Sequence, residues 1–520
     1  MSATNVVLLK EKVSASLPET RERWSAIAVL IFGVVSLYLQ LFIVPATPRA
    51  AVGDQAIYLH NAARMLEGQL IYRDYDHLTL PGTDLLYAAF FRLFGVRAWI
   101  PQAMLLLVGM AMAWLTIFIS RKLVSWKNAI LAGLLFLALP FSSYLDATHH
   151  WFSALAALAA VATIVEIRTP FRLAFAGMFW GLATCFTQSM VLGEVGFAAF
   201  VIWECRQRGD AVRSLVKKEG GLLGGFVATV AAINVPIIQR VGFKQFLYFT
   251  VVFVLKYYPA DRINTWRIYL HEWPRFHIWA NWPDLVAWPL MHLLVPFIYV
   301  LFFVYYRSSQ RLQNPQWERL VLLNVTGVSL FLTIASAPVW HRLFSVSAPS
   351  LIVLAWMLDS KPGAERSNGR LMAAAVCLLV IKPVVTQVRW KETLDLPAGR
   401  TAFFEPAMSS KFQWLTARTS PGEYLFGDPL AGFALRLKNP SRIAFLRPTD
   451  YTRPEEVEGV ITGLEQHQVR FVSWNRGLNA PAEAGNHLSP LVQYLHVHYH
   501  VARVFANRDE IWERNQSSEL

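Results

Sequence analysis

The stretch AWIPQAMLLLVGMAMAWLTIFI at residues 98–119 contains no charged side chain. An α-helix needs a run of about 20 predominantly apolar residues to cross the hydrocarbon core of a bilayer. A helix on the surface of a soluble protein would instead place charged residues along one side. We therefore expect this stretch to be a transmembrane helix, and it is the reference for interpreting the rest of the chain.

Comparable apolar runs occur on both sides of this stretch. We expect eleven spans in total, at residues 24–44, 98–119, 129–145, 152–167, 173–187, 190–203, 221–238, 285–305, 320–335, 343–358 and 371–385. The first span is expected to be retained as a helix, because no small-residue cleavage site typical of a signal peptide follows it. The predicted fold class is an α-helical polytopic membrane protein, with residues 24–387 as its transmembrane domain.

The composition supports this fold class. The chain has 520 residues, of which 55% are hydrophobic, and its mean hydropathy is +0.36, which exceeds what one soluble core needs. The net charge of +13 indicates basic cytoplasmic loops or grooves for anionic lipid head groups. Nucleic acid is not an expected partner, because the basic residues form no continuous face. Cys185, Cys205 and Cys377 lie in or at the end of predicted spans, so no disulfide framework is expected.

The distribution of Lys and Arg predicts the orientation, because these residues concentrate in cytoplasmic loops. The connections after the second, fourth, sixth, eighth and tenth spans are basic, whereas those at 146–151 and 188–189 carry no Lys or Arg. Residues 1–23 are therefore expected in the cytoplasm. Residues 388–520 are then extracytoplasmic, and the expected location is the inner (plasma) membrane of a bacterium.

Two long connections, residues 45–97 and 239–284, face outward in this topology. The first contains Ala56, Leu59, Ala62, Ala63 and Leu66 at helical spacing and a short apolar run at 84–94. The second contains an apolar run at 243–255, which is followed by aromatic residues suited to headgroup depth: Tyr257, Tyr258, Trp266, Trp273, Trp279 and Trp282. We expect both connections to rest on the membrane and to form the walls of a cavity.

Residues 388–520 show the pattern of a small α/β domain. Residues 424–426, 443–446 and 469–474 are predicted strands, and 454–466 is a predicted helix opened by Thr452, with Pro454 in its first turn. Residues 501–505 and 510–513 are predicted to form a hairpin. The expected role of this domain is to recognise an acceptor or to cover the cavity.

Asp54 is the principal candidate for chemistry, in the sequence GDQAIY at residues 53–58. A carboxylate at the mouth of a membrane cavity can serve as a general base, because partial burial raises its pKa toward the working pH. The alternative is that Asp54 only caps the helix that follows, since Asp is among the best capping residues.

The residues around Asp54 carry a family resemblance. Residues 53–95 include Tyr58, Arg64, Met65, Leu66, Gly68, Tyr72, Arg73 and Asp74, followed by Leu80-Pro81-Gly82 and Phe91-Arg92-Leu93-Phe94-Gly95. This segment resembles the first exported loop of the GT-C glycosyltransferases, in the branch that contains protein O-mannosyltransferases, the aminoarabinose transferase of lipid A and RgtA-like enzymes.

The resemblance implies a function. Such enzymes transfer a sugar from a polyprenyl-phosphate carrier to an extracytoplasmic acceptor, which is a lipid, glycan or protein, and the role of base would fall to Asp54. Many relatives carry a second acidic residue where this chain has Gln55, and an amide is a weaker ligand for a hard cation. We therefore expect a metal-independent mechanism with no obligate cofactor, and a divalent metal is the alternative left open.

Other polar residues are candidates for substrate binding, each with a plainer alternative. Asp74, Asp76 and His77 could hold a divalent ion or belong to a solvated loop. Asp146, His149 and His150 line the cavity or anchor the interface. The candidate phosphate ligands, which could instead reach lipid head groups, are Lys256, Arg262, Arg267, Arg275, His341 and Arg342.

The remaining candidates are weaker. Gln188 and Glu194 lie near the turn between the fifth and sixth spans, and Glu194 is either intramembrane or shallow. His496, His498 and His500 alternate as metal ligands can, but a solvated helix end explains them better because no Cys or carboxylate accompanies them at ligand spacing.

Two other function classes remain as alternatives to an enzyme. A transporter or flippase of lipid-linked sugars is disfavoured, because the chain shows no matched halves with paired broken helices. A non-catalytic scaffold that presents the exported domain is the third class, and Gln55 keeps it open.

Overall fold

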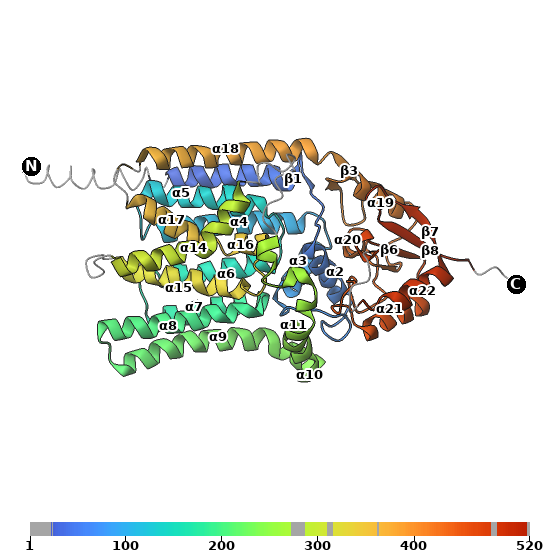
Figure 1. Cartoon of the computed structure of the whole chain (residues 1–520), viewed down its shortest axis with the longest axis horizontal. Helices are drawn as coiled ribbons and strands as arrows, with labels where there is room; N and C mark the ends of the chain where they lie inside the picture. Colours follow the sequence, from blue (N-terminus) through green and yellow to red (C-terminus); the bar gives the residue numbers. More distant parts are fainter. Residues whose placement is uncertain are drawn as a thin grey trace, which may run out of the picture.

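The computed structural model describes residues 22, 24–271, 286–308, 316–360, 363, 365–479 and 486–516. Long helices lie roughly parallel in one bundle, and the C-terminal domain covers one end of it (Figure 1). The turn between helices α8 (Val191–Arg208) and α9 (Val212–Val241) lies at the opposite end. The two ends of the bundle therefore differ, because only one carries a folded domain.

Each predicted span corresponds to an apolar helix or pair of helices. The first helix covers Trp24–Leu41. The others are α4 (Ile100–Ser120), α5 (Trp126–Phe136), α6 (His149–Ile164), α7 (Pro170–Phe186), α8, α9, α14 (Ala287–Ser308), α15 (Trp317–Ile334), α16 (Trp340–Ser345) with α17 (Ala348–Asp359), and α18 (Glu365–Arg389). Among the described residues, 6 helices are long and apolar enough to cross a membrane. The crossing of the shorter helices stays a prediction.

Two predicted spans are not single α-helices. The span at 343–358 divides between α16 and α17, because Pro349 lies in the first turn of α17, where its missing N–H costs no intrahelical hydrogen bond. The span at 129–145 begins as α5, continues as one π-helical turn at Leu137–Phe141 that contains Pro140, and has left helical structure by Tyr144. Both corrections have a proline as their physical cause.

Small residues set the closest approach in the bundle. A Cβ atom at Gly177 of α7 would lie 1.9 Å from the carbonyl oxygen of Leu222 in α9, and one at Gly225 would lie 2.0 Å from that of Ala174. The backbones of α7 and α9 are therefore in direct contact, as membrane helices with glycine at their interface permit.

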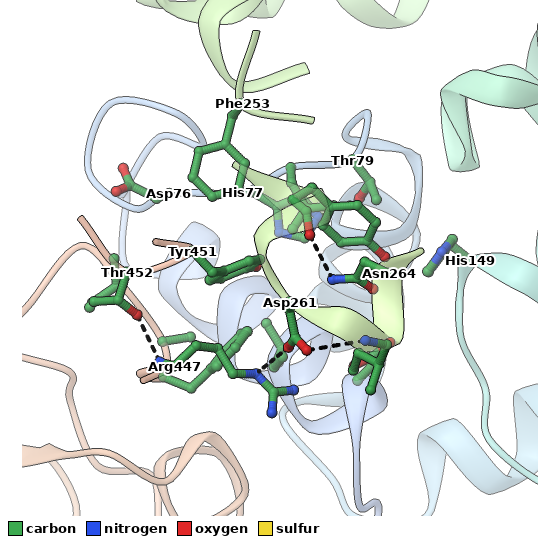
Figure 2. A pocket seen from close by; sticks show the side chains of 18 of the residues that line it. Asp76, His77, Thr79, His149, Phe253, Asp261, Asn264, Arg447, Tyr451 and Thr452 are labelled. Atoms are coloured by element: carbon green, nitrogen blue, oxygen red, sulfur yellow. Dashed lines mark hydrogen bonds and ion pairs between the residues drawn. The ribbon is translucent and has the colours of Figure 1, made fainter. Parts of the chain in front are cut away.

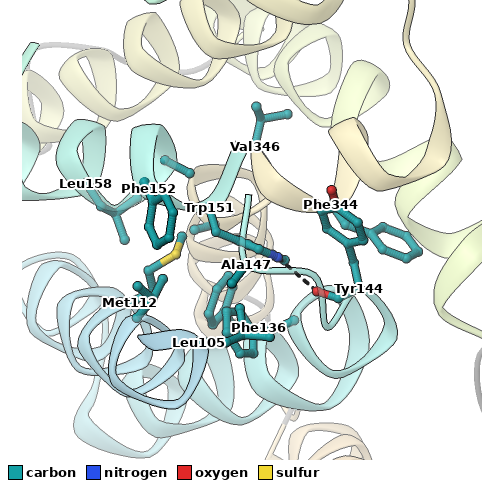
Figure 3. Close-up of a cluster of buried hydrophobic side chains, with 14 of the residues drawn as sticks. Leu105, Met112, Phe136, Tyr144, Ala147, Trp151, Phe152, Leu158, Phe344 and Val346 are labelled. Atoms are coloured by element: carbon teal, nitrogen blue, oxygen red, sulfur yellow. Dashed lines mark hydrogen bonds between the residues drawn. The ribbon is translucent and has the colours of Figure 1, made fainter. Parts of the chain in front are cut away.

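A buried aromatic cluster holds the segment between the π-helical turn at Leu137–Phe141 and α6 in place. Trp151 has no exposed surface, and its ring centroid lies 4.7 Å from that of Phe141 with the two rings tilted. Its indole N–H donates to the carbonyl oxygen of Tyr144 at 2.9 Å (Figure 3). The hydrogen bond and the ring contact hold the two ends of this segment close together. The segment carries Asp146 and His149, so this cluster fixes the position of both.

The first long connection forms helices α2 (Asp54–Leu66) and α3 (Gly82–Phe94). The prediction that these helices rest on the membrane is wrong for α2, which is buried between α3 and the C-terminal helix α20 (Pro429–Ala434). A Cβ atom at Gly432 would lie 2.5 Å from the ring of His60, so α2 and α20 pack without a gap. The reason is that α2 carries buried side chains on more than one face, including Tyr58, Asn61 and Arg64.

The second long connection is helical in its apolar part. It contains α10 (Phe243–Leu247), a π-helical turn at Tyr248–Val252, α11 (Phe253–Lys256), two short 3₁₀ turns and α12 (Ile268–His271). Phe249 stacks on Tyr72 of the first connection with ring centroids 6.0 Å apart, so the two connections touch. Trp273, Arg275, Trp279 and Trp282 lie outside the described residues.

The C-terminal domain combines a two-stranded and a four-stranded sheet. Strands β3 (Glu392–Leu394) and β4 (Thr401–Phe403) pair antiparallel. The larger sheet has the order β5-β6-β8-β7, from β5 (Leu425–Phe426), β6 (Phe471–Trp474), β7 (Tyr499–Val504) and β8 (Glu510–Arg514), and only β5 and β6 are parallel. Helices α19 (Pro406–Thr416), α21 (Pro454–Gln466) and α22 (Ser489–His498) complete it.

Most predicted elements of this domain are confirmed, and two details are wrong. The hairpin of β7 and β8 and the bounds of α21 agree with the prediction. Residues 443–446 form no strand, because the preceding residue pairs with the first connection instead: the N–H of Asp76 donates to the carbonyl oxygen of Arg442 at 3.0 Å. Thr452 does not open α21, because its hydroxyl accepts a hydrogen bond from the N–H of Arg447 at 2.7 Å and Arg453 takes the capping position.

Candidate active site

A cavity of about 280 Å³ lies where the bundle meets the C-terminal domain. Its walls come from five parts of the chain: α2 with the loop after it, the start of α6, the second long connection, the segment around α16, and residues 443–456 of the C-terminal domain. Figure 2 shows labelled residues from four of them, without the segment around α16. The side chains that line it include Asp54, Tyr58, His77, His149, Tyr258, Asp261, Arg342, Arg447 and Tyr451. A small cavity with apolar walls and a few convergent polar groups is the usual form of a binding site.

Asp54 is the first residue of α2 and its side chain is exposed to the cavity. The capping position belongs to Gly53, whose φ of +69° suits glycine, and no side chain caps the helix. The interpretation of Asp54 as the helix cap is therefore wrong. Among the described residues, none donates a hydrogen bond to its carboxylate, which leaves both oxygens accessible to a ligand.

The walls of the cavity displace bulk water around Asp54, and this burial raises the pKa of its carboxyl. The positive charges of Arg342 and Arg447 act in the opposite direction and lower the pKa. Burial and the two arginines thus shift the pKa of Asp54 in opposite directions, which suits a carboxyl that accepts a proton from a ligand in the cavity.

A second carboxyl lies directly behind Asp54. A Cβ atom at Gly53 would lie 3.4 Å from Oδ2 of Asp146, so the backbone at Gly53 passes close to that carboxyl. Burial raises the pKa of Asp146 well above its usual value, and the charge of Asp54 raises it further. Asp146 therefore holds its proton more strongly than an ordinary carboxyl does, and of the two carboxyls only Asp54 lines the cavity.

Two arginines from distant parts of the chain line the same cavity. Arg342 of α16 donates from Nη1 to the carbonyl oxygen of Ala337 at 3.1 Å and from Nη2 to the hydroxyl of Tyr258. Arg447 of the C-terminal domain forms an ion pair with Asp261, with 3.3 Å between Nε and Oδ2 (Figure 2). Planar guanidinium groups that converge on one cavity suit a phosphate, whose oxygens accept several hydrogen bonds at once.

A chain of polar contacts forms the opposite wall. The hydroxyl of Tyr58 lies 2.6 Å from Nδ1 of His149 and 3.4 Å from the hydroxyl of Thr79. Thr79 in turn lies 2.5 Å from Nε2 of His77, and that nitrogen lies 3.4 Å from Oδ2 of the buried Asp84. These contacts join α2, α3 and α6 through one polar chain.

Burial shifts the pKa values of His77 and Asp84, the last two groups of this chain, toward their uncharged forms. Burial lowers the pKa of His77 to about 3 and raises that of Asp84 well above its usual value. The two side chains are therefore in polar contact at 3.4 Å, and burial favours the neutral form of each.

Comparison with solved structures gives matches over nearly the whole chain. ArnT from Cupriavidus metallidurans bound to undecaprenyl phosphate superposes with a TM-score of 0.60 and 13% identity over 99% of both chains. The oligosaccharyltransferase AglB from Archaeoglobus fulgidus, in complex with an inhibitory peptide and a dolichol-phosphate, gives a TM-score of 0.53 and 12% identity over 95% of this chain and 75% of AglB.

The chain has the GT-C fold. The same ArnT in the apo state matches with a TM-score of 0.56, 13% identity and coverage of 96% of this chain and 98% of ArnT. No protein-family model matches the sequence, and no curated protein matches it by sequence. The likeness thus lies in the arrangement of helices and loops. The sequence identity to ArnT and AglB is too low to transfer the role of any residue to this chain.

Within this GT-C fold, the cavity gathers some of the predicted site residues and not others. Those that line it are Asp54, Asp76, His77, His149, His341 and Arg342. Asp146 and His150 lie just behind the wall, and the ring centroid of His150 lies 3.8 Å from that of His149 with the rings tilted. Asp74 pairs with Arg73 at 2.7 Å outside the cavity. Lys256 and Arg262 are exposed and line other surfaces.

The residues predicted as alternative metal ligands do not come together around one point. Asp76 forms an ion pair with Arg442 at 2.7 Å, and His77 is hydrogen-bonded to Asn61 and Thr79, so the two are directed to different partners. In the part of the chain that the structure describes, no three His, Cys, Asp or Glu residues form a group that could hold a metal ion. His496, His498 and His500 are exposed on α22 and β7.

Gln55 and Gln188 have structural contacts close to the cavity. Gln55 is buried and its side-chain oxygen accepts a hydrogen bond from the N–H of Ala147 at 3.2 Å, which ties α2 to the turn before α6. Gln188 donates to the carbonyl oxygens of Leu78 at 2.8 Å and Thr250 at 3.3 Å and so bridges the two long connections. Glu194 is buried in α8.

Sequence reasoning missed the contribution of the C-terminal domain. Arg447, Tyr451, Thr452 and Glu456 line the cavity, as does Asp261, the ion-pair partner of Arg447. The only available signal was an arginine in a segment without clear strand or helix periodicity, Arg447-Pro448-Thr449-Asp450. Irregular segments often carry functional residues, but the pattern does not reveal which wall they join.

Proposed function

We propose that the chain is a membrane glycosyltransferase that moves a sugar from a polyprenyl-phosphate carrier to an extracytoplasmic acceptor. The observation that carries the proposal is the position of the Asp54 carboxylate, which has no hydrogen-bond donor among the described residues and shares one cavity with two arginines. ArnT binds undecaprenyl phosphate and AglB binds a dolichol-phosphate, which supports a donor of the same chemistry.

In the proposed reaction Asp54 accepts the proton of an acceptor hydroxyl or amine. The deprotonated atom attacks the anomeric carbon of the sugar and forms the new bond to it. The bond between that carbon and the phosphate oxygen breaks, and the oxygen keeps the electron pair. Arg342 and Arg447 stabilise the charge that develops on the departing polyprenyl phosphate. Attack from the side opposite the leaving group inverts the anomeric centre.

The proposed orientation places the cavity outside the cytoplasm. Basic residues flank the turn between α8 and α9, at the end of the bundle remote from the C-terminal domain (Figure 1): Arg206 and Arg208 end α8, and Arg213, Lys217 and Lys218 lie at the start of α9. At that end Arg168, buried near the end of α6, forms an ion pair with Glu204 at 2.7 Å. The concentration of Lys and Arg favours the cytoplasm for this end and the far side for residues 388–520.

The test uses the purified full chain in lipid nanodiscs, with undecaprenyl-phosphate-linked hexoses and pentoses as donors. Asp54→Asn is expected to abolish release of undecaprenyl phosphate, because an amide cannot accept the acceptor's proton. The matched control is Asp74→Asn, which makes the same change in the same loop but outside the cavity.

The binding arm of the test measures the affinity for undecaprenyl phosphate alone and needs no knowledge of the sugar. Arg342→Gln is expected to weaken it, and Arg503→Gln, at an exposed position of β7, is the matched control. Transfer by Asp54→Asn at the wild-type rate would refute the assignment of the base. Binding that Arg342→Gln leaves unchanged would refute the phosphate site.

A further inference from the structure

The polar chain on the wall of the candidate active site has a direction, and one amide group sets it. The side-chain nitrogen of Asn61 lies 3.0 Å from Nδ1 of His77. An amide nitrogen can only donate, so Nδ1 of His77 accepts this hydrogen bond. Burial favours the neutral form of His77, and its single ring proton is then on Nε2.

The proton on Nε2 of His77 determines the next steps of the chain. Nε2 lies 2.5 Å from the hydroxyl oxygen of Thr79, which accepts it. Among the described residues, the hydroxyl of Tyr58 is the other side-chain partner of Thr79, at 3.4 Å, and it receives the proton of Thr79. Tyr58 in turn donates to Nδ1 of His149 at 2.6 Å. In this order every proton has an acceptor, as buried polar groups require.

The reverse order fails at Thr79. If Tyr58 donated to Thr79, the hydroxyl of Thr79 would receive two protons, and its own proton would have no acceptor among the described side chains. The contact of Tyr58 with His149 is also shorter than its contact with Thr79. Nδ1 of His149 is therefore the acceptor at the end of the chain, and the ring carries its proton on Nε2.

Nε2 of His149 is open to a ligand. His149 is the first residue of α6, lines the cavity and is 8% exposed. None of the described residues forms a hydrogen bond with its Nε2, and protein atoms do not enclose this nitrogen, in contrast to Nε2 of His150. The N–H at this position is a donor whose orientation is fixed by the hydrogen bond at the other ring nitrogen.

The position of His149 indicates which part of a donor substrate it meets. His149 and Arg447 lie on opposite sides of the cavity (Figure 2). Tyr58, the partner of His149, follows Asp54 by one turn of α2, so this wall is on the side of the proposed base. A neutral N–H suits an uncharged hydroxyl, whereas a phosphate is bound more strongly by charged donors such as the arginines.

We propose that His149 donates its Nε2–H to a hydroxyl of the transferred sugar. Asn61, His77, Thr79 and Tyr58 are positioning residues, because their hydrogen bonds hold the ring of His149 in one tautomer and one orientation before the sugar arrives. A donor fixed in advance loses little freedom on binding. The sugar as ligand rests on the proposed transferase function, whereas the direction of the hydrogen-bond chain does not.

The direction of the chain is tested by ¹⁵N NMR of the full chain in lipid nanodiscs, with labelled histidines and the His149 signals identified by their loss in His149→Gln. The neutral Nε2–H tautomer is expected at neutral pH. Thr79→Val interrupts the chain and is expected to give a mixture of the two neutral tautomers. Thr116→Val is the matched control, because Thr116 is a buried threonine of α4 outside the cavity, and it should keep the wild-type signals.

If Thr79→Val does not fold, Tyr58→Phe decides, since it removes the hydrogen bond to His149 directly. A predominant Nδ1–H tautomer or an imidazolium at His149 in the wild type would overturn the proposal. Wild-type His149 signals in the folded variant with the interrupted chain would overturn it as well.

The ligand is tested by equilibrium binding of undecaprenyl phosphate alone and of undecaprenyl-phosphate-linked hexoses and pentoses. His149→Phe keeps a ring but removes the donor, and it is expected to weaken binding of the sugar-linked donor about three- to tenfold. The affinity for undecaprenyl phosphate alone should change less than about twofold. His149→Gln, which supplies an amide N–H, is expected to recover part of the loss.

Equal weakening of both ligands in His149→Phe, or of neither, would overturn the sugar hydroxyl as the ligand. A wild type that binds undecaprenyl phosphate but none of the sugar-linked donors would overturn both this ligand and the proposed function. The NMR measurement needs no ligand and decides the direction of the chain in either case.

Discussion

Arg447 offers the sharpest test of how the candidate active site works, because it reaches the cavity from the C-terminal domain and acts on Asp54 through charge. Arg447→Gln removes one of the two cations that line the cavity with Asp54. Charged hydrogen bonds contribute about 1.5–3 kcal/mol. Arg447 is 44% exposed and already paired with Asp261, so the low end applies, and affinity for undecaprenyl phosphate is expected to fall about tenfold.

The same substitution has a defined effect on the pH dependence. Arg447 lowers the pKa of Asp54, so its removal raises that pKa beyond the increase caused by burial. A base must be deprotonated to act, and the acid limb of the transfer rate therefore moves to higher pH in Arg447→Gln. Asp261→Asn has the opposite effect, because it frees Arg447 from its ion pair, and its acid limb moves to lower pH.

Two measurements decide between the outcomes: equilibrium binding of undecaprenyl phosphate, and the transfer rate between pH 5 and pH 8 in the enzyme saturated with donor. Arg503→Gln, at an exposed position, controls for loss of a positive charge elsewhere in the domain. The reasoning is refuted if Arg447→Gln and Asp261→Asn shift the acid limb in the same direction, or if both bind undecaprenyl phosphate like the wild type.

Three further predictions concern packing and buried charge. Gly53→Ala is expected to reduce transfer and lower the melting temperature, because the new methyl group would face Asp146 at a backbone φ of +69°; normal activity would contradict it. The pKa of Asp84 is raised in the folded state, so the stability that its proton contributes is lost as the pH rises above the pKa of Asp84 in the unfolded chain. The melting temperature of Asp84→Asn should therefore rise relative to that of the wild type between pH 5 and pH 8. A difference in melting temperature that stays the same over this pH range would refute the prediction. Gly177→Ala should destabilise the bundle by about 1–3 kcal/mol in thermal unfolding. Gly224→Ala is the control, because no atom lies within 4 Å of the added methyl group, and it should be neutral or slightly stabilising. Equal effects of the two substitutions would exclude the close approach of α7 and α9.

The helices could be predicted from the sequence because burial in lipid demands long uncharged runs, and residues 98–119 fulfil that demand without tertiary context. The division at Pro349 and the π-helical turn at Pro140 were readable in principle, since proline interrupts helical hydrogen bonding. The role of residues 443–446 was not, because an apolar run of that length suits a strand as well as a cavity wall. Its pairing with Asp76 depends on a contact between distant parts of the chain.

In the candidate site, too, some features could be predicted from the sequence and others depend on tertiary contacts. Asp54 could be found from its local sequence, but nothing in the sequence indicated that Gly53 would take the capping position and leave the carboxylate exposed to the cavity. Arg342 was found because it follows Trp340 and His341 at the predicted mouth of a span. Arg447 was missed because its importance comes from the fold, which brings it to a carboxylate several hundred residues earlier in the chain.

The ion pair between Asp76 and Arg442 has a consequence for biosynthesis. It helps to join the first long connection, which is made early, to a wall of the cavity that leaves the ribosome only after all the predicted membrane helices. We therefore expect a partly synthesised chain that ends before Arg442 to have no closed cavity around Asp54. If the chain is the proposed transferase, sugar transfer would begin only once residues 443–456 have folded against the first connection, so the end of synthesis would time the onset of activity.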